Sequence, residues 1–484
     1  MNRRRTVTKE MPQHAPELHT PDWVKHAVFY QIFPDRFANG DPSNDPVNVQ
    51  PWGTPPTPHH FMGGDLEGIR QKLPYLQELG VTALYLNPIF QSTSNHRYNT
   101  YDYFRIDPKL GTMDDFHRLC SALHEREMRL ILDGVFNHCG RGFFPFHDVI
   151  ENGSHSAYVG WFHIAKFPIH PYDGRKRANY ACWWGVRSLP KFNTDNPQVR
   201  QFLLSVARYW IEQGADGWRL DVPNEIDDDT FWQAFRQTVK GANPEAYIVG
   251  EIWKDARRWL RGDQFDGVMN YPLRDLLMDF IAKGACDAPE FAERLWRLFR
   301  RYPREATYAL LNLLGSHDTP RWLTVCDGDL RRAMLGYTLL FTLPGAPCVY
   351  YGDEIGMMGD GDPHCRACFE WHRRRWNRRL HQHVRALIAL RRSSTAWRTG
   401  ELAVLHAEGQ LLAYARWQDE AFWVVVVNND TKRWQGTLPF RKRVLPRVHA
   451  LQGVHTGTLC TVNAGRSDVL TVPARSATIW KGIR

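Results

Sequence analysis

Residues 129–138 read RLILDGVFNH, an apolar run that ends in an acid, an amide and an imidazole. Buried parallel strands read this way, because helices cover both faces of their sheet. Similar runs recur along the chain with helical patterns between most of them, and eight such units over about 370 residues predict a (β/α)8 TIM barrel of the α/β class. The expected strands are 27–33, 82–90, 129–136, 216–222, 247–252, 267–271, 307–314 and 347–351.

The segments between these strands show helical spacing. Apolar residues recur every three or four positions within 65–80, which predicts one helix there. Thr112 and Asp115 approximate a capping box, so a second helix is expected to begin at this point. Two more helices are expected at 197–213 and near 230–239.

The alternation pauses at 139–195, in a stretch rich in aromatic residues, Gly, His and Pro. That stretch is too long for an ordinary connection, so we expect an inserted loop subdomain after the third strand. After residue 398 the pattern changes to short runs at 410–416, 421–428 and 469–473, which are typical of a small all-β sandwich domain. The expected division is an N-terminal tail at 1–25, a catalytic barrel at 26–138 and 196–398, an inserted subdomain B at 139–195 and a C-terminal β-sandwich domain at 399–484.

The composition is that of a soluble globular protein, since 43% hydrophobic and 23% charged residues exclude disorder, collagen and a coiled coil. No apolar stretch reaches the roughly 18 residues of a membrane span, and the basic start lacks the apolar core of a signal peptide. The nine cysteines are irregularly spaced, which favours reduced thiols, and the lone CxxC at 365–368 lacks the second pair typical of zinc sites. We therefore expect a cytoplasmic protein without a membrane partner.

The net charge of +9 is spread over 484 residues, and its densest part is the arginine run within 373–379. A solvated helix face explains such a run more simply than a nucleic-acid patch does. No helix-turn-helix, zinc-finger or RNA-binding motif accompanies the run, so no nucleic-acid partner is expected.

Charged and imidazole side chains stand at the ends of four expected strands. One aspartate in such a place is usually a cap or a turn residue. Because the C-terminal ends of barrel strands converge, four such ends together predict one shared cleft. Burying several charged groups in one cleft costs free energy, so such a cluster indicates a functional site. The residues are Asp133, Asn137 and His138; Arg219 and Asp221; Glu251 and Trp253; and His317 and Asp318.

Two of these carboxylates are expected to differ in charge. Arg219 lies two positions before Asp221 on the same face of a strand, so it should hold that acid ionised, ready to act as a nucleophile. Glu251 has no cation two positions away, and its neighbour there is the Trp253 ring, which should raise the pKa of Glu251 as a general acid requires. One low and one high carboxylate pKa are typical of a glycosidase.

The segments DGVFNH, GWRLDVPNE, GEIW and LLGSHD resemble the four signature regions of the α-amylase superfamily of glycoside hydrolases. The segment LPKFN at 189–193 resembles the extra motif of its neopullulanase, cyclomaltodextrinase and maltodextrin glucosidase branch, as do PGAPCVYYGDEIGM and GDPHCR. The resemblance runs from about residue 26 to the C-terminus, with the motifs in the right order on the right strands.

The resemblance implies retaining hydrolysis of α-1,4-glucosidic bonds in maltooligosaccharides or cyclomaltodextrins, with tolerance of α-1,6 branches and with transglycosylation as a side reaction. It implies that Asp221 is the nucleophile, Glu251 the acid/base and Asp318 the carboxylate that orients sugar hydroxyls. The substrate-binding residues that it implies are Arg219, His138, His317, His96, Tyr98, Asp362, Arg366, Trp253, Asn224 and Glu225.

The loop after the first strand carries hard oxygen ligands. Asn, Asp and Gly are ordinary turn residues, so the loop alone predicts little. It resembles the calcium loop of the same branch, which also uses a carbonyl and an aspartate from a later GGD segment, and so implies a structural Ca²⁺. The implied ligands are Asn39, Asp41, Asn44, Asp45, Gly63 and Asp65.

The chain departs from its branch in three respects, one of which is Asn99 in place of the Asp that is usual in the HxYDT segment. Members of the branch usually carry a β-sandwich domain before the barrel that builds a dimer, whereas residues 1–25 are all that precede it here, so the oligomeric state stays open. Pro223 follows the nucleophile segment where a small residue is common, and its fixed φ should reshape the acceptor side. The alternatives are a catalytically silent glycan-binding protein on the same fold and an exo-acting α-glucosidase of different linkage preference.

Overall fold

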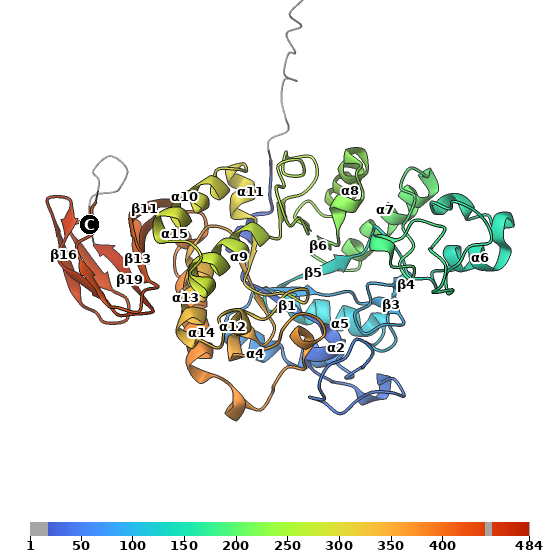
Figure 1. Cartoon of the computed structure of the whole chain (residues 1–484), viewed down its shortest axis with the longest axis horizontal. Coiled ribbons are helices and arrows are strands. Elements are labelled where there is room, and N and C mark those ends of the chain that lie inside the picture. Colours follow the sequence, from blue (N-terminus) through green and yellow to red (C-terminus); the bar gives the residue numbers. More distant parts are fainter. Residues whose placement is uncertain (1–17, 441–447, 484) are drawn as a thin grey trace, which may run out of the picture.

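The computed structural model describes residues 18–440 and 448–483. Its centre is a barrel of strands surrounded by helices, and the C-terminal β domain and helix α6 (Phe144–Asn152) lie at opposite ends of the long axis (Figure 1). Most of the predicted N-terminal tail lies outside the described residues. The end of that tail forms helix α1 (Asp22–His26), whose Val24 is fully buried in the core inside the barrel. Helix α1 therefore belongs to the barrel rather than to a tail.

Eight parallel strands form the barrel, in the spatial order β8-β7-β6-β5-β2-β1-β10-β9. A parallel bridge between Met269 and Leu311 joins the two ends of this order, and the Asn270 amide donates to the Leu311 carbonyl at 2.8 Å. The predicted (β/α)8 barrel is confirmed. Its strands are β1 (Phe29–Ile32), β2 (Ala83–Leu86), β5 (Arg129–Gly134), β6 (Gly217–Leu220), β7 (Tyr247–Gly250), β8 (Gly267–Val268), β9 (Leu311–Leu313) and β10 (Ala346–Tyr350).

Side chains at alternate positions of these strands point into the barrel. Phe29 and Ile131 pack in the apolar core near the N-terminal ends of their strands. Two positions later, on the same faces, stand the buried polar residues Gln31 and Asp133. The barrel interior therefore changes from apolar to polar toward the C-terminal strand ends, where TIM-barrel active sites lie.

Helices cover the outside of the barrel, and polar side chains cap the N-terminal ends of several of them, among them α5, α7 and α8. The predicted capping box is present in α5, where the Asp115 amide donates to the Thr112 hydroxyl at 3.3 Å and the Thr112 amide donates to the Asp115 carboxylate at 2.7 Å. The helices around the barrel are α2 (Pro34–Phe37), α3 (Leu66–Gln71), α4 (Leu73–Leu79), α5 (Met113–His124), α7 (Pro197–Glu212), α8 (Asp229–Ala242), α9 (Tyr271–Leu277), α10 (Ala288–Phe299), α11 (Arg304–Tyr308), α12 (Trp322–Val325), α13 (Leu330–Thr342), α14 (Arg378–Arg392) and α15 (Thr395–Arg398).

Prolines shorten two predicted elements. The single helix expected at 65–80 is two helices, α3 and α4, because Pro74 has no amide hydrogen to continue the first. The strand expected at 82–90 stops at the end of β2, because Pro88 cannot donate to the sheet. The chain then forms a hairpin of β3 (Phe90–Ser92) and β4 (Thr100–Ile106).

The strand predicted at 307–314 is also shorter, because its first part is helical. The Pro303 carbonyl accepts hydrogen bonds from the Thr307 amide at 2.9 Å and from the Thr307 hydroxyl at 3.2 Å, which completes the short helix α11. Only the three residues of β9 join the sheet.

The segment between β5 and α7 leaves the barrel, as the predicted subdomain at 139–195 requires. It contains α6 and the short helical turns η2 (Gly153–His155), η3 (Val159–Trp161) and η4 (Trp183–Gly185). Isolated antiparallel bridges fasten it, including one between His138 and Lys191 and one between Cys182 and Pro190. These bridges bring the LPKFN segment back beside the end of β5.

The C-terminal part is an all-β domain, as predicted. A seven-stranded antiparallel sheet in the order β11-β12-β13-β19-β15-β16-β17 faces a two-stranded sheet of β14 and β18. Val424 and Val426 of the larger sheet and Val472 of the smaller one share a core. The strands are β11 (Glu401–Glu408), β12 (Leu411–Gln418), β13 (Ala421–Asn428), β14 (Trp434–Gly436), β15 (Ala450–Gly453), β16 (Leu459–Asn463), β17 (Arg466–Ser467), β18 (Leu470–Val472) and β19 (Ser476–Ile483).

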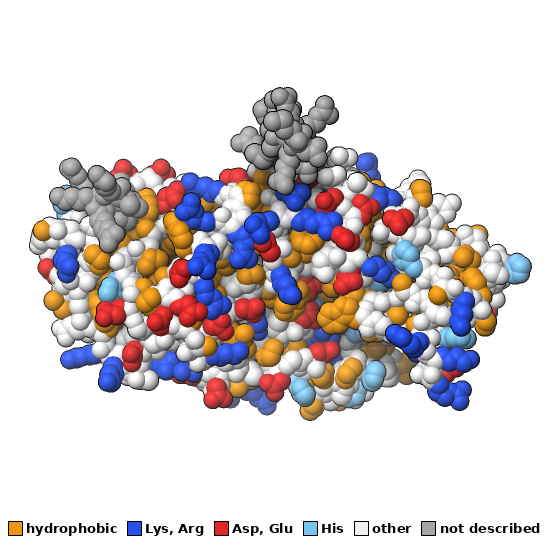
Figure 2. Space-filling model, turned by 45° about the horizontal axis from the view of Figure 1, so that its top comes forward, with side chains coloured by type: hydrophobic (Ala, Val, Ile, Leu, Met, Phe, Trp, Pro, Cys, Tyr) orange, Lys and Arg blue, Asp and Glu red, His pale blue; other side chains and the backbone are white. Residues whose placement is uncertain are grey.

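The positive net charge does not gather into one patch on the face drawn in Figure 2, where basic and acidic side chains are interspersed. Within the arginine run, Arg375 pairs with Glu370 at 2.9 Å and Arg373 with Glu78 at 3.6 Å. The described residues contain no helix long and apolar enough to span a membrane. All nine cysteines are described, and none forms a disulfide.

Candidate active site

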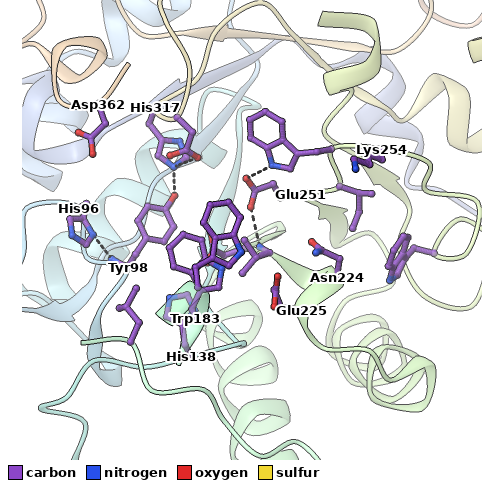
Figure 3. A pocket seen from close by; sticks show the side chains of 18 of the residues that line it. His96, Tyr98, His138, Trp183, Asn224, Glu225, Glu251, Lys254, His317 and Asp362 are labelled. Carbon is purple, nitrogen blue, oxygen red and sulfur yellow. Dashed lines mark hydrogen bonds and ion pairs between the residues drawn. The ribbon is translucent and has the colours of Figure 1, made fainter. Parts of the chain in front are cut away.

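A cavity of about 990 Å³ opens at the C-terminal ends of the barrel strands (Figure 3). All but one of the predicted catalytic and substrate-binding residues line it. The exception is Arg219, which is fully buried behind the cavity wall. The predicted residues that line the cavity are His96, Tyr98, His138, Asp221, Asn224, Glu225, Glu251, Trp253, His317, Asp318, Asp362 and Arg366.

Arg219 of β6 is the centre of a buried charge cluster. Its Nη1 lies 2.8 Å from Asp133 Oδ1 and 3.0 Å from Asp221 Oδ1, and its Nη2 lies 3.0 Å from Glu251 Oε2. Strand register explains the set, because Asp133 of β5 pairs directly with Arg219 and Asp221 follows two positions later on the same face. Glu251 follows the next strand, β7. One guanidinium therefore draws together carboxylates from three neighbouring strand ends.

This cluster corrects the expectation about the two acids. Glu251 has no cation on its own strand, but Arg219 reaches it from the neighbouring one. Burial raises the pKa of Asp221 well above its usual value, Arg219 opposes that shift, and Glu251 adds to it. Burial also raises the pKa of Glu251, in the direction expected. Arg219 lowers the pKa of Asp221, as expected, but burial, which is the larger effect, and the neighbouring carboxylates raise it, so the net shift is opposite to the expected one.

Backbone and indole groups hold the Glu251 carboxylate in place. The Val222 amide donates to its Oε2 at 3.0 Å, and the Trp253 indole donates to its Oε1 at 3.1 Å. Val222 has φ +36° and ψ +50°, a left-handed conformation that is strained for a β-branched residue. Strain of this kind persists where the surroundings demand it, and here it aims an N–H at a carboxylate.

The turn after Val222 carries the predicted acceptor-side residues. Pro223 begins a short helical turn, η5 (Pro223–Glu225), which presents Asn224 and Glu225 to the cavity. Lys191 Nζ donates to the Glu225 carbonyl at 2.6 Å and lies 3.9 Å from its carboxylate. The LPKFN segment therefore braces the turn that follows β6.

Asp318 lies between two nitrogen donors. Its Oδ2 is 2.9 Å from His317 Nε2, and its Oδ1 is 3.3 Å from Arg366 Nη2. Burial alone would raise the pKa of Asp318, but the hydrogen bond from His317 and the positive charge of Arg366 outweigh it, so the pKa is lowered. Arg366 also pairs with Asp362 at 3.1 Å, so these three residues form one side of the cavity.

Two more histidines in the cavity are kept neutral by burial. Burial lowers the pKa of His96 to about 3, with Arg366 adding to the effect, and lowers the pKa of His138 to about 3. His138 Nε2 is buried without a hydrogen-bond partner in the structure, which leaves it free for a ligand. The Tyr98 ring lies between His96 and His317, nearly parallel to the latter at 5.3 Å between centroids.

Sequence reasoning missed part of the cavity wall. Trp183 and Trp184 stack at 4.9 Å between centroids, and Trp184 is 79% exposed with φ +47°. Their signal was two adjacent tryptophans in the aromatic-rich stretch 139–195. Trp253, which also lines the cavity, stacks on Tyr271 at 3.6 Å. The other lining residues that were not predicted are Leu189, Val222, Ile252, Lys254, Asp255 and Trp259.

The predicted calcium loop folds into a compact cluster. Asn39 Nδ2 donates to both carboxylate oxygens of Asp45, at 2.9 and 3.1 Å. Gly63 packs against this pair, and a Cβ at Gly63 would lie 2.2 Å from Asp45 Oδ1. Only glycine fits at this position, which also has a left-handed φ of +78°.

The other three loop residues are held by hydrogen bonds. Asp65 Oδ2 accepts from the Asp41 amide at 2.8 Å and from Asn44 Nδ2 at 3.1 Å. The Asp41 carboxylate accepts from the Ser43 amide at 3.0 Å. Asn39 Oδ1 and Asn44 Oδ1 are buried without a hydrogen-bond partner in the structure. Amide oxygens without hydrogen-bond partners, lying among carboxylates, are suitable ligands for a hard cation. In the described ranges, no group of three His, Cys, Asp or Glu side chains is arranged as a metal site without such amide or carbonyl oxygens.

Known families and proteins match this chain along most of its length. The α-amylase catalytic domain matches residues 31–403, and the neopullulanase-like C-terminal domain matches residues 402–481. A cyclomaltodextrinase of Geobacillus thermopakistaniensis is 48% identical over 448 residues, which cover 91% of this chain and 76% of that protein. Neopullulanase 2 of Thermoactinomyces vulgaris is 48% identical over 415 residues, which cover 85% of this chain and 70% of that protein.

Solved structures match the whole architecture. The cyclic α-maltosyl-(1→6)-maltose hydrolase of Arthrobacter globiformis, in complex with that sugar, is 43% identical with a TM-score of 0.87 and covers 96% of this chain and 99% of its own. The debranching enzyme of Nostoc punctiforme is 43% identical with a TM-score of 0.88 and covers 97% of this chain and 100% of its own. The chain therefore belongs to the α-amylase family of glycoside hydrolases, on the branch that contains the neopullulanases and cyclomaltodextrinases.

Proposed function

We propose that this protein hydrolyses α-1,4-glucosidic bonds in maltooligosaccharides and cyclomaltodextrins with retention of the anomeric configuration. The observation that carries the proposal is the pair Asp221 and Glu251, each 3.0 Å from a terminal nitrogen of Arg219. The shared guanidinium brings both carboxylates to one wall of the cavity, and retaining enzymes place their two acids about 5–5.5 Å apart. Inverting enzymes need roughly 6.5–9.5 Å to admit a water between them.

In the first step, Asp221 attacks the anomeric carbon as the carboxylate, the form that Arg219 stabilises from 3.0 Å, and a covalent glycosyl-enzyme forms. The bond from that carbon to the glycosidic oxygen breaks, and Glu251 gives its proton to the leaving oxygen. In the second step, a water attacks the same carbon while Glu251 takes its proton and the bond to Asp221 breaks. A sugar hydroxyl in place of the water gives transglycosylation.

Asp318 serves the same reaction by accepting hydrogen bonds from glucosyl hydroxyls and stabilising the cationic transition state. Its lowered pKa supports this role, because it stays a carboxylate when Glu251 carries a proton. Arg366 and His317 hold it from both sides. Asp133 is a positioning residue, since it fixes Arg219 without lining the cavity.

The substrate class follows from the aromatic rings around the cavity. Flat rings stack on the faces of glucosyl units, and Trp253 and Trp184 offer such faces. The names of the relatives support cyclic and branched α-glucans, because one is a cyclomaltodextrinase and another hydrolyses cyclic α-maltosyl-(1→6)-maltose. We therefore propose tolerance of α-1,6 linkages as well.

The test is product analysis on maltotriose, β-cyclodextrin, panose and pullulan by chromatography, with NMR of the first anomer released. We expect ring opening of β-cyclodextrin and α-anomers first. A β-anomer first, or binding of these sugars without any release of product, would overturn the proposal. Cleavage of maltotriose and panose without ring opening would identify an exo-acting α-glucosidase instead, because a ring has no chain end.

We propose in addition that the loop at 39–45, with Gly63 and Asp65, holds a structural Ca²⁺. The orphaned oxygens of Asn39 and Asn44 support this, together with the carboxylates beside them. A bound Ca²⁺ would tie the loop to the start of α3 and stabilise the folded state by about 2.7 kcal/mol at a hundredfold excess over Kd. A chelator should lower the Tm, and an unchanged Tm with no calcium in metal analysis would leave the loop a plain turn.

We propose a cytoplasmic location. Nine cysteines without a disulfide fit a reducing compartment. An intracellular maltogenic amylase of Bacillus subtilis is 42% identical over 86% of this chain. Fractionation of producing cells should recover the activity from the lysate, and activity released into the medium by intact cells would contradict this location.

A further inference from the structure

We propose that Gln31 is a positioning residue that keeps the His317 ring neutral, with its proton on Nε2, through a chain of amides anchored on Asp133. Gln31 lies on β1, is 1% exposed and does not line the cavity. His317 does line it, beside Asp318. The effect on activity rests on the proposed function, whereas the position of the proton does not.

The chain of amides begins at Asp133. Its Oδ1 pairs with Arg219 at 2.8 Å, and its Oδ2 accepts from the hydroxyls of Tyr85 and Tyr98, both at 2.7 Å. Asn87 Nδ2 lies 2.9 Å from the Tyr98 oxygen and 3.5 Å from Asp133 Oδ2. Because Tyr98 gives its own proton to the carboxylate, its oxygen accepts from Asn87. A reversed Asn87 amide would aim its carbonyl at two acceptors, so its orientation is fixed.

The orientation of Asn87 fixes that of Gln31. Asn87 Oδ1 faces Gln31 Nε2 at 3.0 Å, and the same Nε2 lies 2.9 Å from His317 Nδ1. The amide nitrogen carries two hydrogens, one for each of these partners. His317 Nδ1 is therefore an acceptor and carries no proton.

The opposite edge of the ring requires the same arrangement. His317 Nε2 lies 2.6 Å from the Tyr98 oxygen and 2.9 Å from Asp318 Oδ2. The Tyr98 proton points to Asp133, so both of these oxygens face His317 as acceptors and Nε2 must carry the hydrogen. An imidazolium would need a second N–H on Nδ1, which would point at the N–H of Gln31.

The neutral ring matters because the transition state of glycoside hydrolysis is oxocarbenium-like and cationic. An imidazolium beside Asp318 would repel that charge and cancel part of the stabilisation from the carboxylate. Gln31 is thus expected to keep the site active at acidic pH, although it never touches the sugar. The same Asp133 that fixes Arg219 fixes this amide chain.

The deciding variant is Gln31→Glu. A carboxylate oxygen in place of the amide nitrogen accepts a proton from Nδ1 and favours the imidazolium, so the acidic limb of kcat/KM on maltotriose should move up by about 1–3 pH units. Gln31→Met keeps the size but removes the amide, so the limb should move less and kcat should fall with KM nearly unchanged. Gln264→Glu is the matched control, since Gln264 is another buried glutamine, bonded to Asp229 outside the cavity.

The direct measurement is ¹⁵N NMR of histidine-labelled protein without substrate, with the His317 signals assigned through a His317→Asn variant. We expect a neutral ring protonated on Nε2 in the wild type near pH 6, and a doubly protonated ring in Gln31→Glu at the same pH. A wild-type ring protonated on Nδ1, or on both nitrogens, overturns the proposal whether or not the variants fold. An acidic limb that stays in place in both variants also overturns it. A wild type that hydrolyses no α-glucan would defeat the proposed function alone.

Discussion

The floor and the rim of the cleft are built in different ways. The floor consists of Arg219, Asp221 and Glu251, which stand on or directly after neighbouring strands and are almost fully buried. The rim consists of loop residues, of which Trp253 is 43% and Trp184 is 79% exposed. Sheet register sets the spacing of the floor, whereas loops set that of the rim. We infer that the floor carries the chemistry and the rim the choice of substrate.

The largest effect is expected on the floor, from Asp221→Asn. The amide keeps the shape of the side chain but is a poor nucleophile, so kcat should fall by roughly four orders of magnitude or more. The thermal unfolding curve should stay close to that of the wild type, because Asp133 and Glu251 still pair with Arg219 in the variant. Asp227→Asn is the matched control, an exposed aspartate that pairs with Arg258 outside the cavity and should keep full activity. Activity of Asp221→Asn within tenfold of the wild type would contradict the assignment.

The second prediction separates the roles of the two floor acids by product stereochemistry. Glu251→Gln removes the proton donor, so maltotriose turnover should fall by about 10²–10⁴-fold, and less on an aryl α-glucoside whose leaving group needs no proton. Azide should then intercept the glycosyl-enzyme and yield an α-glucosyl azide. In Asp221→Gly, azide should enter the space of the lost carboxylate and yield a β-glucosyl azide by one displacement. The same anomer from both variants would refute the division of roles.

The floor was largely predictable from the sequence, for a physical reason. Residues two apart on a strand share a face, and barrel strands converge at one end, so motifs such as GWRLD locate their side chains. What failed was the charge argument, because it considered one strand at a time. The contact from Arg219 to Glu251 crosses from β6 to β7 and depends on strand order, which no local pattern contains.

The rim was less predictable because no period governs a loop. Trp253 was found only because it directly follows a strand motif, whereas Trp183 and Trp184 lie in the inserted stretch, where residue spacing gives no direction. Their placement depends on isolated bridges such as that between Cys182 and Pro190. In the fold, two of the misses came from prolines: Pro74 divides a helix and Pro88 ends a strand, although the apolar pattern runs through both.

The third prediction concerns the rim and is smaller. Trp184→Ala removes an exposed ring that stacks on Trp183, so the ratios of kcat/KM among maltotriose, panose and β-cyclodextrin should change by about 1–3 kcal/mol. The pH profile on any single substrate should keep its shape, because no titrating group is lost. Trp296→Ala is the control, since Trp296 is 50% exposed on α10 and does not line the cavity. Equal losses on all three substrates would mean that Trp184 supports the loop rather than the sugar.

The smallest effect is expected where the floor and the rim meet, at Lys191. Its ammonium donates to the Glu225 carbonyl at 2.6 Å and so braces the turn that carries Asn224 and Glu225. Lys191→Met keeps the aliphatic stem but removes the brace, and a loosened turn should shift the ratio of α-1,4 to α-1,6 cleavage by a few-fold, about 1 kcal/mol or less. Lys191→Arg retains a donor and should restore part of the ratio. The measurement is the ratio of α-1,4 to α-1,6 cleavage products of panose, separated by chromatography, for the wild type and both variants. A change in kcat/KM on aryl α-glucosides, which leave the acceptor side almost empty, would instead place the effect of Lys191 on the donor side of the cleft, through the charge that it sets near His138.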